Sequence, residues 1–377
     1  MISAAASVRE FARILRGEDL AFAAFDRTPD EFIRACADED LSGLVYECVR
    51  ALPDNAEWPF PVREALAREA RENMVAELAR RAQIVVVLDA LSAVGVQPLL
   101  FKGTALAYTL YQLPHLRPRL DTDLFIDKAD LEAVTRKFVE LGYLQPAYCD
   151  GELLFGQVMF TKTDALGIDH VFDVHWRVST QSVAARLVTF AELSAAAVDV
   201  PALGRGARSV GPAHALLLAC VHAVVHHRNA ERLIWIHDIH LLVSRLCPAE
   251  LEEFVRLAIA RRVAAVCGHS LSVARKRLGT SIPDRVMRQL SDGAVDEPSA
   301  VYLEPGRSWR HEQASNMAGL AGWTDRMQLA REVLLPSPAY MRKRYRLRPG
   351  PLGTVLLPAL YVHRVVRGGL AMLRGRK

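Results

Sequence analysis

The chain has 377 residues, of which 51% are apolar and 24% are charged, and its formal net charge is only +4. This length exceeds that of one small domain and predicts two or three packed units around a sizeable core. A general nucleic-acid-binding protein normally carries a one-sided charge, so we expect no long nucleic acid as a partner.

The cysteines and the lengths of the apolar runs indicate in which cellular compartment the protein is found. The six cysteines are scattered and form no C-x-x-C pair, which favours buried thiols in a reducing environment. The first residues lack a continuous apolar stretch, so we expect no signal peptide. No uncharged apolar run is long enough to cross a bilayer, and we therefore expect a cytoplasmic protein.

Residues 1–95 carry helical patterns and no evident chemistry. The segment 8–15 has apolar residues at helical spacing. Thr28, followed by proline and two acids, is typical of a helix start. The run 62–91 consists of strong helix formers and predicts one long helix. We expect this N-terminal helical region to support the unit that follows it.

Residues 96–211 alternate between strand and helix patterns and predict an α/β unit. We expect helices at 104–112 and 131–141, the second capped by Asp130 and ended by Gly142. The expected strands are 97–102, 120–127, 143–148, 153–161 and 168–178, with the last two joined as a hairpin.

Two aspartates begin the second of these strands. Asp121 and Asp123 are two residues apart, so on a strand both side chains lie on one face. Neighbouring carboxylates repel each other and resist burial unless a cation lies between them. Such oxygen ligands suit Mg²⁺, with Mn²⁺ as the alternative, and Asp173 in a later strand is a third candidate ligand. The other interpretation of a D-x-D pair is a solvated turn or a helix cap.

The stretch Lys102-Gly103-Thr104 joins the first strand to a helix. Free N–H groups at a helix start favour phosphate, and a glycine lets the backbone approach it closely. Lys102 could add a charge to this contact and Thr104 a hydroxyl, although Lys102 also fits a solvated strand end. Arg117 and Arg119, on the loop before the aspartates, fit either phosphate contacts or solvated side chains.

These motifs together resemble a family of uncharacterised bacterial nucleotidyltransferases within the DNA polymerase β-like superfamily. The resemblance spans roughly residues 30–340 and is sharpest over 97–178. It rests on three stretches of sequence: Lys102–Leu106, Arg117–Leu124 and Asp173–Trp176. It implies an α+β fold, a polymerase β-like nucleotidyltransferase mixed sheet with helices, flanked by N-terminal and C-terminal helical regions.

The resemblance also implies roles for residues. Asp121, Asp123 and Asp173 would be the three metal-binding carboxylates, with Asp173 also taking the proton of the acceptor. Gly103 and Thr104 would form the phosphate-binding turn, where the superfamily has Gly-Gly or Gly-Ser. The gap between the glycine and the first aspartate is longer here than in the smallest members.

The expected function is metal-dependent transfer of a nucleoside monophosphate from an NTP, with ATP as the expected nucleotide. The acceptor is not indicated, and pyrophosphate is the other product. The alternative from a different class is a non-catalytic nucleotide- or partner-binding module associated with a membrane.

Several further residues are candidates. His175 shares the strand face of Asp173 and fits either a substrate contact or a satisfied histidine. Residues 212–340 predict a C-terminal helical domain, in which His222 and His226 lie one helical turn apart. They lack the glutamate of a zinc-binding H-E-x-x-H motif. The resemblance instead implies that His222 lies near the nucleotide. Asp238 interrupts an apolar helix face and needs a partner, either Arg232 or a histidine of the preceding helix.

The tail, residues 341–377, is basic and contains no acid. Its basic residues flank an apolar run, a pattern that resembles an interfacial membrane segment. The alternative is a helix packed on the body with a solvated basic face. The sequence does not indicate an oligomeric state.

Overall fold

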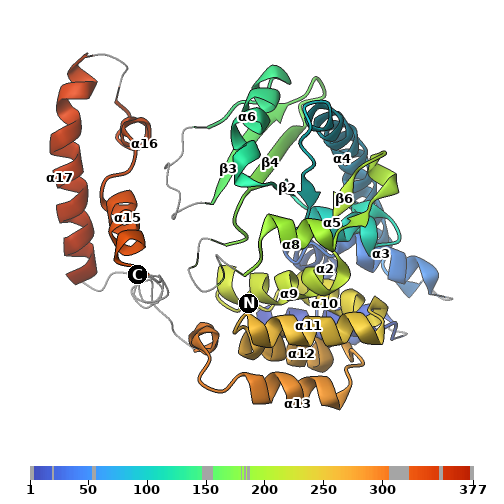
Figure 1. Cartoon of the computed structure of the whole chain (residues 1–377). Helices are drawn as coiled ribbons and strands as arrows, with labels where there is room; N and C mark the ends of the chain where they lie inside the picture. Colours follow the sequence, from blue (N-terminus) through green and yellow to red (C-terminus); the bar gives the residue numbers. More distant parts are fainter. Residues whose placement is uncertain are drawn as a thin grey trace.

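A computed structural model of the chain describes residues 4–18, 21–52, 57–146, 156–179, 181, 184, 187–304, 322–347 and 351–373. A small mixed sheet is surrounded by helices, and the last helices lie at one side (Figure 1). The N-terminal helices are α1 (Ala4–Leu15), α2 (Pro29–Asp38), α3 (Ser42–Ala51) and α4 (Phe60–Ser92).

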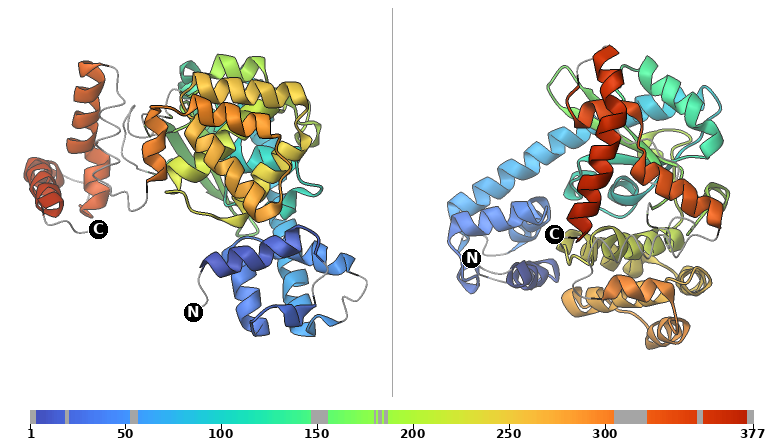
Figure 2. Two further views of the ribbon diagram at one scale, coloured as in Figure 1. Left: turned by 90° about the horizontal axis from the view of Figure 1, so that it is seen from below. Right: turned by 90° about the vertical axis from the view of Figure 1, so that its left-hand side faces the viewer.

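The helical prediction for the N-terminal region is confirmed. Thr28 and Glu31 form the expected cap: the Thr28 side chain accepts from the Glu31 N–H, and the Glu31 carboxylate accepts from the Thr28 N–H at 2.9 Å. Helix α4 has 33 residues and packs against α2 and α3 before it reaches the sheet (Figure 2). Its C-terminal half buries Ile84 and Val87 against the sheet.

The sheet contains six strands in the order β3-β4-β2-β1-β6-β5. They are β1 (Leu99–Leu100), β2 (Asp121–Phe125), β3 (Gln157–Thr163), β4 (Asp169–His175), β5 (Val198–Asp199) and β6 (Arg208–Ser209). The pairs β2–β4 and β1–β6 are parallel, and the other three pairs are antiparallel. The expected α+β mixed sheet is therefore confirmed, as is the hairpin between β3 and β4.

The two faces of the sheet pack against different helices. Leu124, Phe172 and Val174 lie in one core with Phe138 of α6 (Leu131–Glu140). The opposite face bears Phe125, which contacts the rings of Phe101 and of Phe190, the first residue of α8 (Phe190–Ala195). Because side chains alternate along a strand, the odd-numbered residues of β2 and β4 share this second face.

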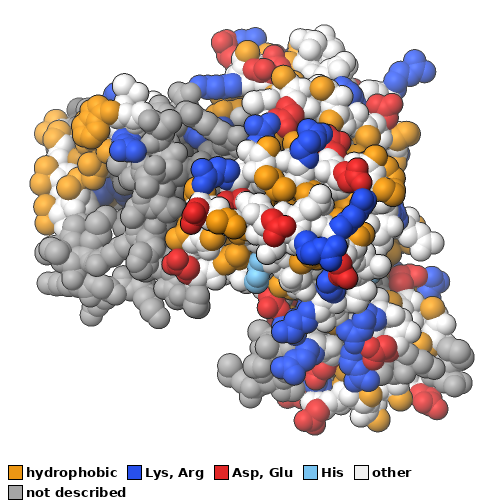
Figure 3. Space-filling model, turned by 60° about the horizontal axis from the view of Figure 1, so that its bottom comes forward, with side chains coloured by type: hydrophobic (Ala, Val, Ile, Leu, Met, Phe, Trp, Pro, Cys, Tyr) orange, Lys and Arg blue, Asp and Glu red, His pale blue; other side chains and the backbone are white. Residues whose placement is uncertain are grey.

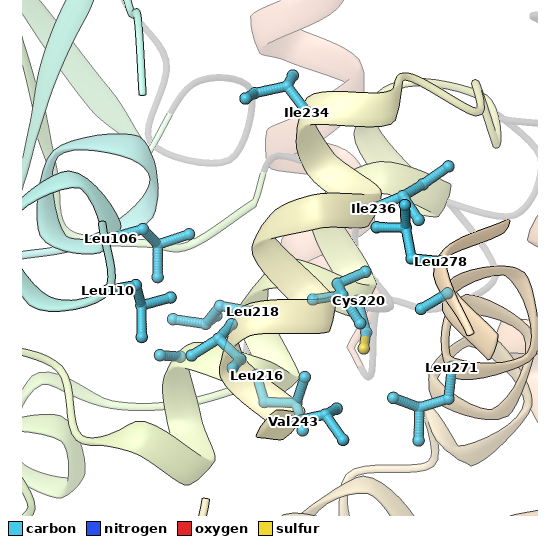
Figure 4. Close-up of a cluster of buried hydrophobic side chains, with 14 of the residues drawn as sticks. Leu106, Leu110, Leu216, Leu218, Cys220, Ile234, Ile236, Val243, Leu271 and Leu278 are labelled. Carbon is cyan, nitrogen blue, oxygen red and sulfur yellow. The ribbon is translucent and has the colours of Figure 1, made fainter. Parts of the chain in front are cut away.

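The C-terminal helices form a second layer of core. They are α9 (Pro212–Val221), α10 (Leu233–Arg245), α11 (Pro248–Ala260), α12 (Ala264–Leu278) and α13 (Asp284–Gly293). Leu106 and Leu110, within and at the end of α5 (Lys102–Thr109), join Leu216 and Leu218 in this core (Figure 4). Apolar residues of α1 to α3 belong to the same cluster, so α5 and the sheet are held between helices from both ends of the chain.

Helices α15 (Trp323–Leu334), α16 (Pro338–Arg344) and α17 (Pro351–Leu373) follow. Helix α17 packs on α15 and α16, away from the sheet (Figure 1). Throughout the described residues, every helix is too short or too polar to cross a membrane. Shorter helical turns occur at Phe22–Ala24, Pro114–Leu116, Lys128–Asp130, Pro201–Leu203, His222–His226 and Pro298–Leu303.

Three local predictions were wrong or only partly tested. The expected strand 97–102 shortens to β1, because the backbone turns at Lys102 and α5 begins there. Asp130 makes no side-chain cap, whereas Asp127 accepts a hydrogen bond from the Ala129 N–H at 2.9 Å. Within 143–146 a single bridge pairs Leu144 with Thr161, and residues 147–155 lie outside the described part. The division of the chain into four units stays a prediction.

Candidate metal and nucleotide site

The parallel pairing of β2 with β4 brings the candidate acids together. Asp123 is the register partner of Asp173, and Phe125 is the partner of His175. Asp121 and Asp123 on β2 therefore lie on the same sheet face as Asp173 and His175 on β4. The expected common face of the three carboxylates follows from this register.

Asp123, Asp173 and His175 form the tightest group at the site. One ligand atom from each lies within 4.8 Å of the others. Asp123 and His175 are 4% and 2% exposed, and Asp173 is half-buried. Two carboxylates and an imidazole at this separation could bind a metal ion. Asp121 is not a member of this group, although it is close enough to act on Asp173 electrostatically.

Asp173 has an incomplete set of partners. Its Oδ2 accepts a hydrogen bond from Gln157 Nε2 at 3.1 Å. Its Oδ1 is buried and finds no hydrogen-bond partner among the described residues. Burial, together with the neighbouring charges of Asp123 and Asp121, raises the pKa of Asp173 to about 6. A buried carboxylate oxygen without a donor is the kind of atom that a cation satisfies.

His175 directs its Nε2 at Asp123 in the same group. Its Nε2 lies 2.9 Å from Asp123 Oδ1, and burial lowers its pKa to about 4. A backbone hydrogen bond at Arg177 acts to raise the pKa of His175, so the imidazole donates that bond. An imidazole whose other nitrogen donates to a backbone carbonyl is oriented in the way typical of metal ligands. Sequence reasoning left this role open, although the D-x-H spacing carried the signal.

Lys102 places its positively charged ammonium group beside Asp123 and His175. Its Nζ donates to Asp123 Oδ1 at 2.8 Å and lies 3.4 Å from His175 Nε2. Burial acts to raise the pKa of Asp123, but Lys102 and His175 outweigh it and hold that pKa well below its usual range. Lys102 has a φ of +52°, a left-handed conformation that costs a non-glycine residue free energy. Because its ammonium group is bound to Asp123, the alternative that Lys102 is a solvated residue at a strand end is wrong.

Thr104 and Arg119 support the site from behind. Thr104 is fully buried, and its hydroxyl accepts from Arg119 Nε at 3.0 Å and donates to the Asp121 carbonyl at 3.4 Å. Arg119 Nη2 also donates to Glu77 Oε1 of α4 at 2.8 Å. Arg119 is therefore engaged within the protein rather than solvated, and the phosphate contacts expected of Thr104 and Arg119 stay predictions. Gly103 lies beside both loop arginines, where an added Cβ would make ordinary contacts at 3.7 Å.

Arg117 forms a buried ion pair that sequence reasoning missed. Its Nε lies 2.9 and 3.0 Å from the two Asp238 oxygens, and its Nη2 lies 2.8 Å from Oδ2. Tyr111 Oη also donates to Asp238 Oδ1 at 2.7 Å. The partner expected for Asp238 was wrong, because Arg232 binds Asp40 at 2.5 Å instead. Arg117 is thus paired within the protein rather than solvated, and its contact with a phosphate stays a prediction.

His222 lies at a distorted end of α9. Residues 222–226 form a π-helical turn, and the Nε2 atoms of His222 and His227 are 3.1 Å apart. The ring of His222 also contacts that of His226, with 5.3 Å between the centroids. His222, Lys102 and Gly103 line a cavity of about 40 Å³ with Trp235 and Asp238. Burial lowers the pKa of His222 well below its usual range, and Lys102 adds to this effect. The expected nearness of His222 to the nucleotide stays a prediction; the structure shows only that His222 shares this cavity with Lys102 and Gly103.

A comparison with known families gives one match. The sequence matches the model of a family described as "uncharacterised nucleotidyltransferase" over residues 26–279. This range includes α2 to α12 and all the site residues described above. None of the curated proteins matches the chain.

Proposed function

The chain belongs to this uncharacterised nucleotidyltransferase family, and on that basis we propose that it transfers a nucleoside monophosphate from an NTP to an acceptor. An acceptor oxygen forms a bond to the α-phosphorus, the bond to the bridging oxygen breaks, and pyrophosphate leaves. The acceptor gives up a proton, for which Asp173 is the proposed base. ATP is the nucleotide we expect, and the acceptor is not specified by these residues.

The proposal depends mainly on the group formed by Asp123, Asp173 and His175 on the sheet, in which one buried oxygen lacks a hydrogen-bond donor among the described residues. Asp173 Oδ1 is buried without a donor in the described chain, and one oxygen of this carboxylate lies within 4.8 Å of ligand atoms of Asp123 and His175. These donors fit a divalent cation, and the imidazole makes Mn²⁺ as suitable as Mg²⁺. When bound, the cation would stabilise negative charge on the reacting phosphate oxygens. Asp121, two residues before Asp123, stays a proposed ligand for a second, nucleotide-borne ion.

Lys102 has a second role in this proposal. Its ammonium group lies against the Asp123 oxygen that a cation would also need. When the site is loaded, Lys102 moves from Asp123 toward the phosphates beside Gly103, which its flexible side chain allows. The cavity at Gly103 has room for a few water molecules but not for a base, so the base lies outside it or the cavity widens.

The test is a labelled-NTP assay with pyrophosphate release as the readout, run with Mn²⁺ or Mg²⁺ and an extract as the source of acceptor. Asp123→Asn should reduce transfer about a thousandfold, because it removes a charge on which the transition state depends. Asp169→Asn is the matched control, because Asp169 is exposed at the start of β4, the strand that carries Asp173 further along. It should transfer like the wild type.

Two results would contradict the proposal. One is full activity of Asp123→Asn. The other is an absence of Mn²⁺-dependent stabilisation by every NTP in a thermal-shift titration, which would instead favour a non-catalytic partner-binding module.

A further inference from the structure

Helix α17 turns an apolar stripe outward. Val355, Val362 and Val366 are 76%, 64% and 54% exposed, and Ala359 between them is also exposed. Their spacing of four, three and four residues places them along one line of the helix. Hydrophobic side chains gather at this edge of the molecule, at the left of Figure 3. Contiguous exposed apolar side chains of this kind mark interaction surfaces.

The opposite side of α17 is already occupied. Tyr361 donates a hydrogen bond to the Pro336 carbonyl, and the Arg364 guanidinium lies 5.4 Å from the Tyr340 ring centroid. These contacts fasten the inner side of α17 to the segment that carries α16. The apolar stripe, defined by Val355, Ala359, Val362 and Val366, therefore faces away from its own unit.

The charge of this segment indicates what binds to the apolar stripe. Residues 333–377 contain ten Lys and Arg residues and no Asp or Glu. An anionic lipid surface attracts such a cluster, whereas a second copy of the same segment would repel it. The helix is not long and apolar enough to cross a bilayer, so an amphipathic helix of this kind lies in the plane of the membrane surface.

We propose that α17 docks the protein onto an anionic lipid bilayer. The stripe residues insert at the boundary between headgroups and acyl chains, and the surrounding arginines contact the lipid phosphates. This surface lies outside the range of the family match, so the inference does not depend on nucleotidyl transfer.

The experiment is flotation of the full chain with two kinds of vesicle, phosphatidylcholine alone and phosphatidylcholine mixed with phosphatidylglycerol. The protein should float with the anionic vesicles and little with the neutral ones. Raising the salt from about 0.1 M to about 1 M should weaken this binding, because the screening length falls from about 10 Å to about 3 Å. Absence of binding to the anionic vesicles would overturn the proposal.

Single substitutions then locate the surface. Val355→Glu and Val362→Glu should each weaken partitioning about tenfold or more, because each puts a charge where an apolar side chain would enter the bilayer. Val295→Glu is the matched control: Val295 is 73% exposed, after α13, and should leave partitioning unchanged. Equal binding by all three variants would contradict the assignment of the stripe.

A second copy of the chain is the competing occupant, because the same spacing also suits a helix pair. Sedimentation velocity without vesicles separates the two. A monomer agrees with the proposal, whereas a dimer that Val355→Glu dissociates would overturn it. The stripe is exposed, so the variants should melt like the wild type, and two independent positions guard against a local defect.

Discussion

Two buried clusters of charge draw residues from the same stretch of chain, Arg117 for one and Asp123 for the other, yet they are built differently. Around Asp238, the Arg117 guanidinium binds both carboxylate oxygens and Tyr111 adds a third donor. At the sheet, Asp173 keeps one buried oxygen without a donor in the part of the chain that the structure describes. In the first cluster both carboxylate oxygens have donors within the protein. In the second, a partner for the buried oxygen would have to come from outside the described chain.

This difference separates a structural role from a functional one. A paired and fully hydrogen-bonded charge can remain buried, whereas an unpaired one raises its pKa or recruits a ligand. Arg117 and Asp121 are only four residues apart, so their neighbourhood in the sequence does not distinguish them. What distinguishes the two clusters is whether every buried charged group has its partners in the folded chain.

The largest expected effect is on the complete cluster. Asp238→Asn should lower the free energy of unfolding by about 3–5 kcal/mol, because it leaves the buried Arg117 charge without its counterion. Urea unfolding measures this loss. The double variant Arg117→Met with Asp238→Leu should recover part of the stability, since neither charge remains. A loss below about 1 kcal/mol would mean that the pair is solvated and would break the comparison.

The next effect concerns Lys102. Lys102→Met should raise the affinity for Mn²⁺ without nucleotide about tenfold, because it removes the ammonium that competes for Asp123. An electron-paramagnetic-resonance titration of free Mn²⁺ measures this. Lys162→Met is the control, since Lys162 binds the Leu141 carbonyl instead of a site residue. Weaker Mn²⁺ binding by Lys102→Met would show that Lys102 orients the ligands rather than competing with the metal.

The incomplete cluster also predicts a pH dependence. Burial raises the pKa of Asp173 to about 6, and protons compete with a metal for its carboxylate. Affinity for Mn²⁺ should therefore be constant above about pH 6 and fall about tenfold for each pH unit below it. His175, with a pKa of about 4, adds a second proton only at lower pH. An affinity that does not change between about pH 5 and about pH 7 would count against Asp173 as a ligand.

The smallest effect has the opposite sign to that at Asp238. Asp173→Asn should raise the stability of the metal-free protein at neutral pH by about 1 kcal/mol, because a partly buried charge disappears while Gln157 keeps a partner. Chemical unfolding in the presence of a chelator measures it. A loss as large as that of Asp238→Asn would place both clusters in the same structural class.

The sequence predicted much of the site because strand geometry is local. Period-two alternation placed Asp121 with Asp123, and Asp173 with His175, and strand pairing in the expected sheet brings such pairs together. The family motifs and the helix start at Thr28 were likewise readable from neighbours in the chain. The roles assigned to the individual site residues stay predictions until the substitutions above are measured.

What the sequence by itself determined were the helices and the strand face that bears the acids, since these depend on residues close in the chain, whereas the mixed sheet was implied by the family resemblance. Only the tertiary structure decided that Arg117 binds Asp238, that Arg119 binds Glu77 and that Lys102 meets Asp123. The physical reason is that many arginines and acids are available to pair. The choice among them depends on which side chains the packed helices bury together, and no local pattern encodes that choice.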